Sequence, residues 1–383
     1  MAGRKPQSRK KRMKKDKETS RKATAYFDYT LLFIVLFLVA FGLVIVFSTS
    51  SYTAELKVND PAYYLKRQAV FACLGIAAML ITARLDYHIW KKLSLIMMVA
   101  IIGLLAIVLV MGTDANGSVR WLQLGSFQFQ PSEAAKIVII LYTAHMATIW
   151  AARIGEVKVM ARVAALPLVA VGLIATENLS TGIICAAIIL LIIFVTSPKI
   201  AQFVIMGIAV VLLMGVFLLA ASYRLDRIKV WLHPEQYERG YQTLQALYAV
   251  GSGGIFGKGL GQSIQKLGFI PESHNDYIFS VICEELGLFG AICVIGVFLL
   301  LIWRCVMIAM SAPDLYGALI VIGVVAHISV QVCINIAVVT NTIPPTGVPL
   351  PFISYGGTAI FGLLVEMGLV LSVARKINVH KEY

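Results

Sequence analysis

The sequence predicts an all-helical polytopic membrane protein with about ten transmembrane helices. Of its 383 residues, 59% are hydrophobic and only 14% are charged. Soluble domains have about 25% charged residues. Apolar stretches close to the roughly 20 residues of a spanning helix also recur along the chain. The predicted spans are residues 28–48, 67–84, 89–111, 135–151, 161–176, 181–197, 200–221, 276–303, 316–340 and 355–374.

The charge distribution predicts the orientation of the chain. Residues 1–22 hold eleven Lys and Arg and two acids, which accounts for +9 of the net charge of +13. We expect residues 1–26 to form a disordered basic tail that lies in the cytoplasm and contacts anionic lipid, with no nucleic-acid role. A membrane domain over 27–375 would follow, and a cytoplasmic C-terminal tail over 376–383 would end the chain.

The longest predicted outer loop covers about residues 222–275, between the seventh and eighth helices. It contains the glycine-rich run GSGGIFGKGLG (251–261). This run does not match a phosphate-binding loop, because Ser252 and Gly259 stand where GxxxxGK[ST] requires Gly and Ser or Thr. We expect a flexible re-entrant or amphipathic loop instead.

Ionisable groups in or beside the fourth span form the first functional candidate. In VRWLQLGSFQFQPSEAAK (119–136), Pro131 suits the first turn of a helix and Glu133 suits its positive N-terminal end. Glu133 and Lys136 are three residues apart, so they share a helix face and can pair. Arg120 precedes them. The pattern is typical either of an ion pair at a helix start or of cations that line a cavity open to the outside.

Two further stretches place polar or irregular backbone at the membrane. TENLSTG (176–182), which includes Glu177, is either a tight outer turn or a polar site with partners in protein or water. NTIPPTGVPLPFISYGGT (341–358), which includes Ser354, holds four prolines and three glycines. Such broken backbone must line a cavity or be buried in protein.

The stretch FIPESHNDYIFSVICEELGLFG (269–290) carries the most titratable groups. Asp276 can cap the next helix or act at the water boundary. Glu284 lies eight residues further, about 12 Å deeper and about 80° away around a helix, and Glu285 points about the opposite way from Asp276. The two glutamates therefore point to different faces, and we expect structural or gating roles for them.

Three long runs resemble the SEDS family (shape, elongation, division and sporulation), which includes FtsW, RodA and SpoVE. They are RWLQLGSFQFQPSEAAK, GYQTLQALYAVGSGGIFGKGLGQSIQKLGFIPESHNDYIFSVICEELG and PPTGVPLPFISYGGT, and the resemblance covers about residues 26–376. It implies ten transmembrane helices and a peptidoglycan glycosyltransferase that polymerises lipid II at the outer face of a bacterial cytoplasmic membrane. It also implies a class B penicillin-binding protein and other division proteins as partners. The N-terminal part resembles the FtsW and SpoVE branch more than RodA.

The resemblance assigns roles to individual residues. The family's essential aspartate falls on Asp276, and the Glu and Lys of its fourth-helix motif fall on Glu133 and Lys136. One position departs from the pattern, because Asn178 stands where many members have Asp. A required carboxylate there would have to come from the neighbouring Glu177.

These residues suggest a mechanism. A sugar hydroxyl is a poor nucleophile at neutral pH, so we expect Asp276 to take its proton as general base in a direct displacement with inversion. The leaving pyrophosphate develops charge that cations stabilise, and the resemblance implies Mg²⁺ or Mn²⁺ but no organic cofactor. Candidates for binding the pyrophosphate or sugars are Arg120, Lys136, Lys258, Lys266, His274 and Ser354, whereas Glu133, Glu177, Glu284 and Glu285 are expected to be structural or to line the cavity.

Two alternatives to a polymerase stay open at this point. Many helices, buried charges and broken helix segments are also typical of a transporter, here a lipid II flippase. A scaffold that recruits division proteins without catalysis is the other. The metal ligands, if a metal is used, are not recognisable in the sequence.

Overall fold

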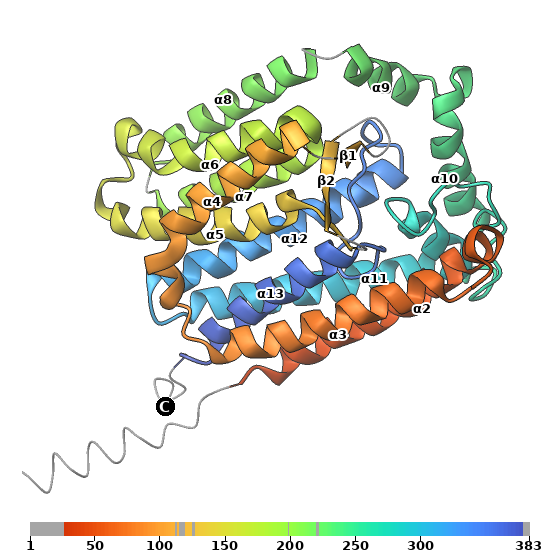
Figure 1. The fold of residues 1–383 in the computed structure, drawn as a ribbon, viewed down its shortest axis with the longest axis horizontal. Coiled ribbons are helices and arrows are strands. Elements are labelled where there is room, and N and C mark those ends of the chain that lie inside the picture. Colours follow the sequence, from red (N-terminus) through yellow and green to blue (C-terminus); the bar gives the residue numbers. More distant parts are fainter. Residues whose placement is uncertain are drawn as a thin grey trace, which may run out of the picture.

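The computed structural model describes residues 27–111, 113–114, 119–124, 127–197, 199–219 and 222–377. The tail predicted over residues 1–26 lies outside the described residues, as do residues 378–383. Each of the ten predicted spans corresponds to a helix, and these helices form one bundle (Figure 1). They are α2 (Tyr29–Val58), α3 (Tyr63–Arg84), α4 (Ile89–Met111), α5 (Pro131–Ile149), α6 (Val157–Glu177), α7 (Leu179–Thr196), α8 (Ile200–Leu219), α11 (Ile278–Met310), α12 (Leu315–Val339) and α13 (Gly357–Ala374).

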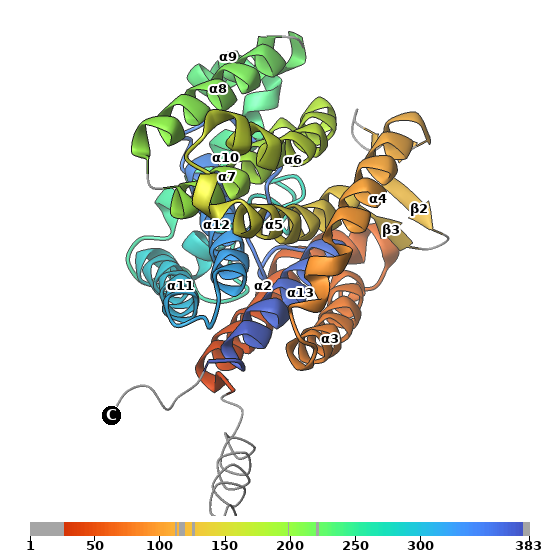
Figure 2. The same ribbon diagram turned by 90° about the vertical axis from the view of Figure 1, so that its left-hand side faces the viewer.

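Within the described residues, eight helices are long and apolar enough to cross a membrane, namely α2, α3, α4, α6, α7, α11, α12 and α13. Helix α5 carries the charged pair Glu133 and Lys136, and both side chains are buried. It lies inside the bundle, in contact with α4, α7 and α12 (Figure 2). A polar helix at this depth requires internal partners for its charges, because hydrocarbon offers none.

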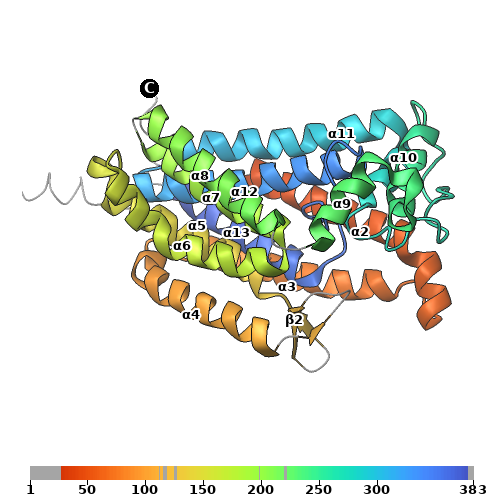
Figure 3. The ribbon, with the colours of Figure 1, turned by 90° about the horizontal axis from the view of Figure 1, so that it is seen from above.

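The outer loops hold more regular structure than the sequence predicts. The strands β1 (Thr113–Asp114), β2 (Val119–Leu124) and β3 (Phe127–Phe129) form a small antiparallel sheet just before α5, which the all-helical prediction lacks. The predicted long loop contains α9 (Ser222–Leu232) and α10 (Tyr241–Ser252), joined by two short 3₁₀ helices. Helix α10 lies at the end of the bundle away from the C-terminus (Figures 1 and 3).

Helix α11 is broken at Gly287, and the glycine-rich run forms hydrogen bonds with backbone groups on both sides of the break. Gly287 has φ +69°, ψ −168°, which interrupts the helix. The carbonyls of Glu284 and Glu285 accept hydrogen bonds of 3.0 and 2.9 Å from the amides of Lys258 and Gly259. On the other side of the break, the amides of Leu288 and Phe289 donate to the carbonyls of residues 254 and 255 at 2.9 and 3.0 Å.

These four hydrogen bonds replace the two that a continuous helix would make between residues 284 and 288 and between 285 and 289. The carbonyls of Glu284 and Glu285 and the amides of Leu288 and Phe289 are therefore not left to lipid, which could not satisfy them. The run predicted as a flexible re-entrant or amphipathic loop is largely a loop after α10, and it is hydrogen-bonded to a membrane helix, which the prediction did not include. The sequence gives no sign of this pairing, since the two segments lie about thirty residues apart.

The close approach of these two segments predicts which glycines are required. Gly257 has φ +79°, and a Cβ there would lie 2.2 Å from the Glu285 carbonyl oxygen. We expect Gly257→Ala to destabilise the fold by about 1–3 kcal/mol through clash and backbone strain. In contrast, a Cβ at Gly251 in α10 meets nothing within 4 Å, so Gly251→Ala should be neutral or stabilising. Thermal unfolding in detergent measures both, and equal melting temperatures would contradict the pairing.

Candidate active site

Asp276 lies half-buried in the turn that leads into α11. Its main-chain carbonyl accepts a 2.7 Å hydrogen bond from Nδ2 of Asn335 in α12. The same Nδ2 donates to the carbonyl of Val348 at 2.9 Å. Because Asn335 is fully buried, it fixes the Asp276 turn against the segment 341–356, which has no helical structure, as its prolines and glycines predict.

A second set of bonds closes the same junction. The hydroxyl of Ser354 donates to the carbonyl of Asn275 at 2.7 Å and accepts from the amide of Leu350 at 2.8 Å. The side chain of Gln68 in α3 bonds the carbonyl of Ser354 at 3.1 Å and the amide of Gly356 at 3.0 Å. Ser354 therefore holds main chain around the Asp276 turn, and its predicted contact with substrate stays a prediction.

Burial sets the proton affinity of Asp276. The pKa of Asp276 is raised to about 7, mainly because burial removes the carboxylate from water. The negative charge of Glu272 also raises this pKa, whereas backbone hydrogen bonds and the positive charge of Arg227 lower it. A carboxyl group with a pKa near the working pH exchanges protons readily in both directions. Asp276 is thus suited to act as a general base, and the residue as a whole is only half-buried.

His274 lies two residues before Asp276 but in a different environment. Its ring is buried between Tyr64 and Tyr355, with ring centroids 4.4 and 5.5 Å away. Burial lowers the pKa of His274 to about 4, so the imidazole is neutral at physiological pH. A neutral ring cannot supply a positive charge to a pyrophosphate. Its predicted substrate contact would have to be a hydrogen bond or packing.

Glu133 and Lys136 form the ion pair that their spacing predicts. The carboxylate and the ammonium are 2.9 Å apart and are both buried, and Pro131 occupies the first turn of α5 as expected. The ammonium of Lys136 also donates to Oε1 of Gln331 in α12 at 3.4 Å. The positive charge of Lys136 is therefore balanced, and its binding to pyrophosphate stays a prediction.

Two buried titratable residues were missed by the sequence analysis. His327 in α12 and Glu366 in α13 are each about 1% exposed, and Nδ1 of the histidine lies 2.8 Å from the carboxylate. A signal was present, because His327, Gln331 and Asn335 follow one another at intervals of four residues. Polar residues four apart share one helix face, which predicts a polar stripe inside an apolar helix.

Glu284 and Glu285, which are predicted to point to different faces, pair with different lysines, and both lysines belong to the segment 258–266. Glu284 pairs with Lys258 at 2.7 Å and also accepts from the hydroxyl of Ser263. Glu285 pairs with Lys266 at 2.8 Å and accepts from the amide of Ser263 at 3.4 Å. These contacts are of the kind that a structural group makes, and whether the two glutamates have the structural or the gating role stays a prediction. The two lysines, predicted to bind pyrophosphate, have their charges neutralised here.

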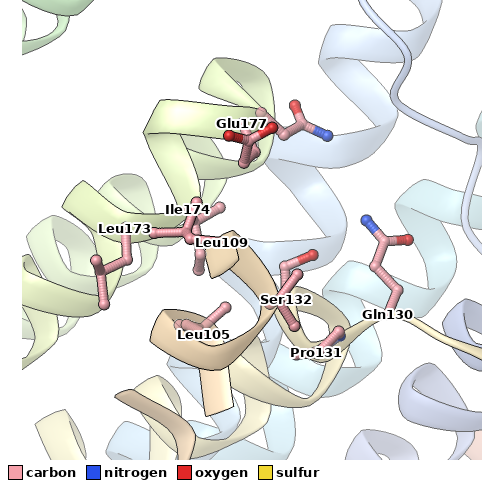
Figure 4. A pocket seen from close by; sticks show the side chains of 10 residues that line it. Leu105, Leu109, Gln130, Pro131, Ser132, Leu173, Ile174 and Glu177 are labelled. Carbon is pink, nitrogen blue, oxygen red and sulfur yellow. The ribbon is translucent and has the colours of Figure 1, made fainter. Parts of the chain in front are cut away.

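Glu177 and Asn178 lie at the junction of α6 and α7, beside the start of α5. They line a small pocket with Gln130, Pro131 and Ser132 (Figure 4). Asn178 caps α7, because its side-chain oxygen accepts from the amide of Thr181 at 3.1 Å. An aspartate would make the same cap, so Asn178 preserves this local structure without a charge.

The remaining predictions concern Arg120 and a metal ion. The backbone of Arg120 belongs to β2, but its side chain is outside the described structure, so its role stays a prediction. Among the described residues, no group of three or more His, Cys, Asp or Glu side chains is arranged to hold a metal ion. These residues do not fit a metal centre formed by protein groups alone.

An apolar groove of about 310 Å³ lies between α2 and α11, next to the glycine-rich run. Four phenylalanines and a short stretch after the helix break form most of its walls. Its lining residues are Phe37, Leu38, Phe41, Phe256, Leu286, Phe289, Gly290, Cys293, Val294 and Val297. A groove of this composition suits a hydrocarbon chain.

Known proteins resemble this chain over most of its length. The FtsW/RodA/SpoVE family model, described as cell cycle protein, matches residues 29–379. Stage V sporulation protein E of Bacillus subtilis is 38% identical over 357 residues, which cover 91% of this chain and 97% of that protein. The probable peptidoglycan glycosyltransferase FtsW of Trichlorobacter lovleyi is 35% identical over 356 residues, 91% of this chain and 93% of the relative.

Solved structures agree with these sequence matches. A chain from a peptidoglycan synthase complex, described as coordinating polymerization and crosslinking, superposes with a TM-score of 0.77 at 29% identity. The rod shape determining protein RodA of Thermus thermophilus gives a TM-score of 0.66 at 28% identity. Each superposition covers 92% of this chain and 98% of the other. With a family model that matches nearly the whole membrane domain, the chain belongs to the FtsW/RodA/SpoVE family, the SEDS proteins.

Proposed function

We propose that the protein is a peptidoglycan glycosyltransferase that polymerises lipid II, with Asp276 as its general base. The observation that carries the proposal is the position of Asp276, half-buried in a turn held by α12 and the segment 341–356, with a pKa of about 7. Relatives named as probable peptidoglycan glycosyltransferases support the activity.

The reaction follows from the chemistry of the substrate. A hydroxyl of one sugar attacks the anomeric carbon of another, and the bond from that carbon to the lipid pyrophosphate breaks. The hydroxyl proton passes to Asp276, and the electron pair of the broken bond leaves with the pyrophosphate. Attack from the face opposite the leaving group inverts the anomeric carbon. The carboxylate raises the nucleophilicity of the hydroxyl, and cations stabilise the leaving group.

The surroundings suit a lipid-linked substrate. The multi-pass bundle places Asp276 at one end of two membrane helices, and the groove between α2 and α11 can hold part of a polyprenyl tail. We place this end outside the cell, with both termini in the cytoplasm, because the basic residues 1–22 favour a cytoplasmic N-terminus. A class B penicillin-binding protein is the proposed partner, supported by the match to a synthase complex. Cell division and sporulation are both consistent with the relatives.

A direct assay separates this function from a flippase and from a scaffold. The purified protein, with its transpeptidase partner, is incubated with lipid II in detergent. A polymerase makes glycan chains, whereas a flippase has no product without two membrane faces and a scaffold has none in any medium. We expect chains from the wild type and none from Asp276→Asn. Polymerisation by Asp276→Asn at the wild-type rate would remove Asp276 as the base.

The pKa of Asp276 predicts the pH dependence of the reaction. Because the base must be deprotonated, kcat/KM should rise with pH and level off above about 7. Glu272→Gln removes a charge that raises this pKa, so its profile should move to lower pH. Arg227→Gln removes a charge that lowers the pKa, so its profile should move to higher pH. Identical profiles for the three proteins would contradict the assignment.

The same pKa predicts a stability effect with a defined sign. Asp276 binds its proton more tightly in the folded state, since burial raises its pKa from 3.8 to about 7. The resulting stabilisation of the folded state is complete below the unfolded-state pKa of 3.8 and is lost as the pH rises through the folded-state pKa of about 7. Asp276→Asn lacks this loss, so its melting temperature should exceed that of the wild type more at pH 8 than at pH 5. A pH-independent difference would be contrary to this expectation.

Lys266 offers a test of whether the paired lysines bind substrate. Lys266→Met leaves Glu285 buried without its cation, which should cost about 3 kcal/mol of stability or more. The double variant Lys266→Met, Glu285→Gln should regain most of that stability and also polymerise lipid II, because the pair is structural. A double variant that folds, as judged by its melting temperature, yet makes no glycan chains would instead assign Lys266 to the pyrophosphate.

A further inference from the structure

Five side chains form a buried hydrogen-bonded network that the proposed reaction does not use directly. Starting from the ion pair on α5, it runs through Lys136 to Gln331, then to His327 at 2.8 Å and on to Glu366 at 2.8 Å. The residues lie on α5, α12 and α13 and are buried. Such an arrangement inside a membrane domain is costly unless every donor and acceptor is matched.

The amide of Gln331 has one possible orientation. Its Oε1 accepts from the ammonium of Lys136, which can only donate. Its Nε2 donates to the carbonyl of Pro349 at 2.8 Å, which can only accept. Both partners agree, so the atom that faces His327 is the oxygen. The Nε2 of His327 must therefore carry a hydrogen.

The other ring nitrogen then determines where one further proton lies. Nδ1 of His327 faces a carboxylate oxygen of Glu366 at 2.8 Å. With Nε2 already protonated, a neutral imidazole would present its lone pair to a carboxylate, which is repulsive. The contact is favourable only when one proton lies between Nδ1 and the carboxyl group, on either partner.

We infer that His327 and Glu366 are a positioning pair, which fixes the direction of hydrogen bonds along the network. The pair thereby sets the orientation of Gln331, and through it the positions of Lys136 and of the Pro349 carbonyl. This inference rests on the proposed function, because polymerisation depends on the positions of Lys136 and of segment 341–356. Gln331 is one helical turn from Asn335, whose side chain holds the carbonyl of Asp276. A misplaced Gln331 thus loses its hydrogen bonds both to Lys136 and to the Pro349 carbonyl of segment 341–356.

A conservative variant tests the direction of hydrogen bonding. Glu366→Gln can donate its amide to Nδ1 of a neutral His327 and leave the proton on Nε2, so the network keeps its direction without a charge. We expect it to polymerise lipid II within about threefold of the wild type, and Glu366→Ala to lose activity by a factor on the order of ten or more. Ser372→Ala, on the same helix, loses a buried hydrogen bond to the Leu85 carbonyl outside the network and should stay active.

The opposite results would overturn the inference. Equal losses in Glu366→Gln and Glu366→Ala would mean that the charge or the proton of Glu366 is required, not its place in the network. Full activity in Glu366→Ala would mean that the pair positions nothing.

A second measurement does not depend on activity or on the folding of Glu366→Ala. Nitrogen-15 spectra of labelled histidine, assigned with His327→Asn, report which ring nitrogen carries a proton. We expect Nε2 of His327 to be protonated in the wild type and in Glu366→Gln, with Nδ1 bare in the latter. A bare Nε2 in either protein would refute the assigned direction of the hydrogen bonds, even if the wild type proved unable to polymerise lipid II.

Discussion

The pairing of the glycine-rich run with the broken helix α11 is the interaction on which the site depends. A helix break inside a membrane exposes amides and carbonyls that lipid cannot satisfy, and here a second segment satisfies them. The carboxylates of Glu284 and Glu285 then bind the residues that follow the run. The chain from there to Asp276 is thus anchored before it enters the turn, and Asn335 and Ser354 complete the attachment.

The charges around the site differ in how they are held. Lys136, Lys258 and Lys266 each pair with a glutamate, so an anionic leaving group would have to share them with carboxylates. Asp276 is governed by burial instead, which favours its neutral form and keeps its pKa near 7. This contrast suits a site in which Asp276 is the base and the pyrophosphate brings a counterion in addition to the paired lysines. We propose that Mg²⁺ or Mn²⁺, which often bind through substrate phosphates, fill that role.

The sequence predicted the helices well because long apolar runs carry their own signal. It also predicted the Glu133–Lys136 pair, whose partners are close in sequence. It did not predict the partners of Glu284 and Glu285, because Lys258 and Lys266 lie in a segment about twenty residues earlier that folds back against the helix. It missed His327 and Glu366, because their contact joins helices nearly forty residues apart. The small sheet before α5 was missed because its strands are two to six residues long.

The matched backbone at the break has a consequence for exchanging parts between related proteins. Residues 254–259 and 284–289 bond through main-chain atoms at close range, so each constrains the path of the other. A chimera that takes one segment from a relative and keeps the other would pair two backbone segments that come from different proteins and need not fit each other. The natural unit of transplantation is therefore the whole stretch from α10 to the first turns after Gly287, with Asp276 carried inside it.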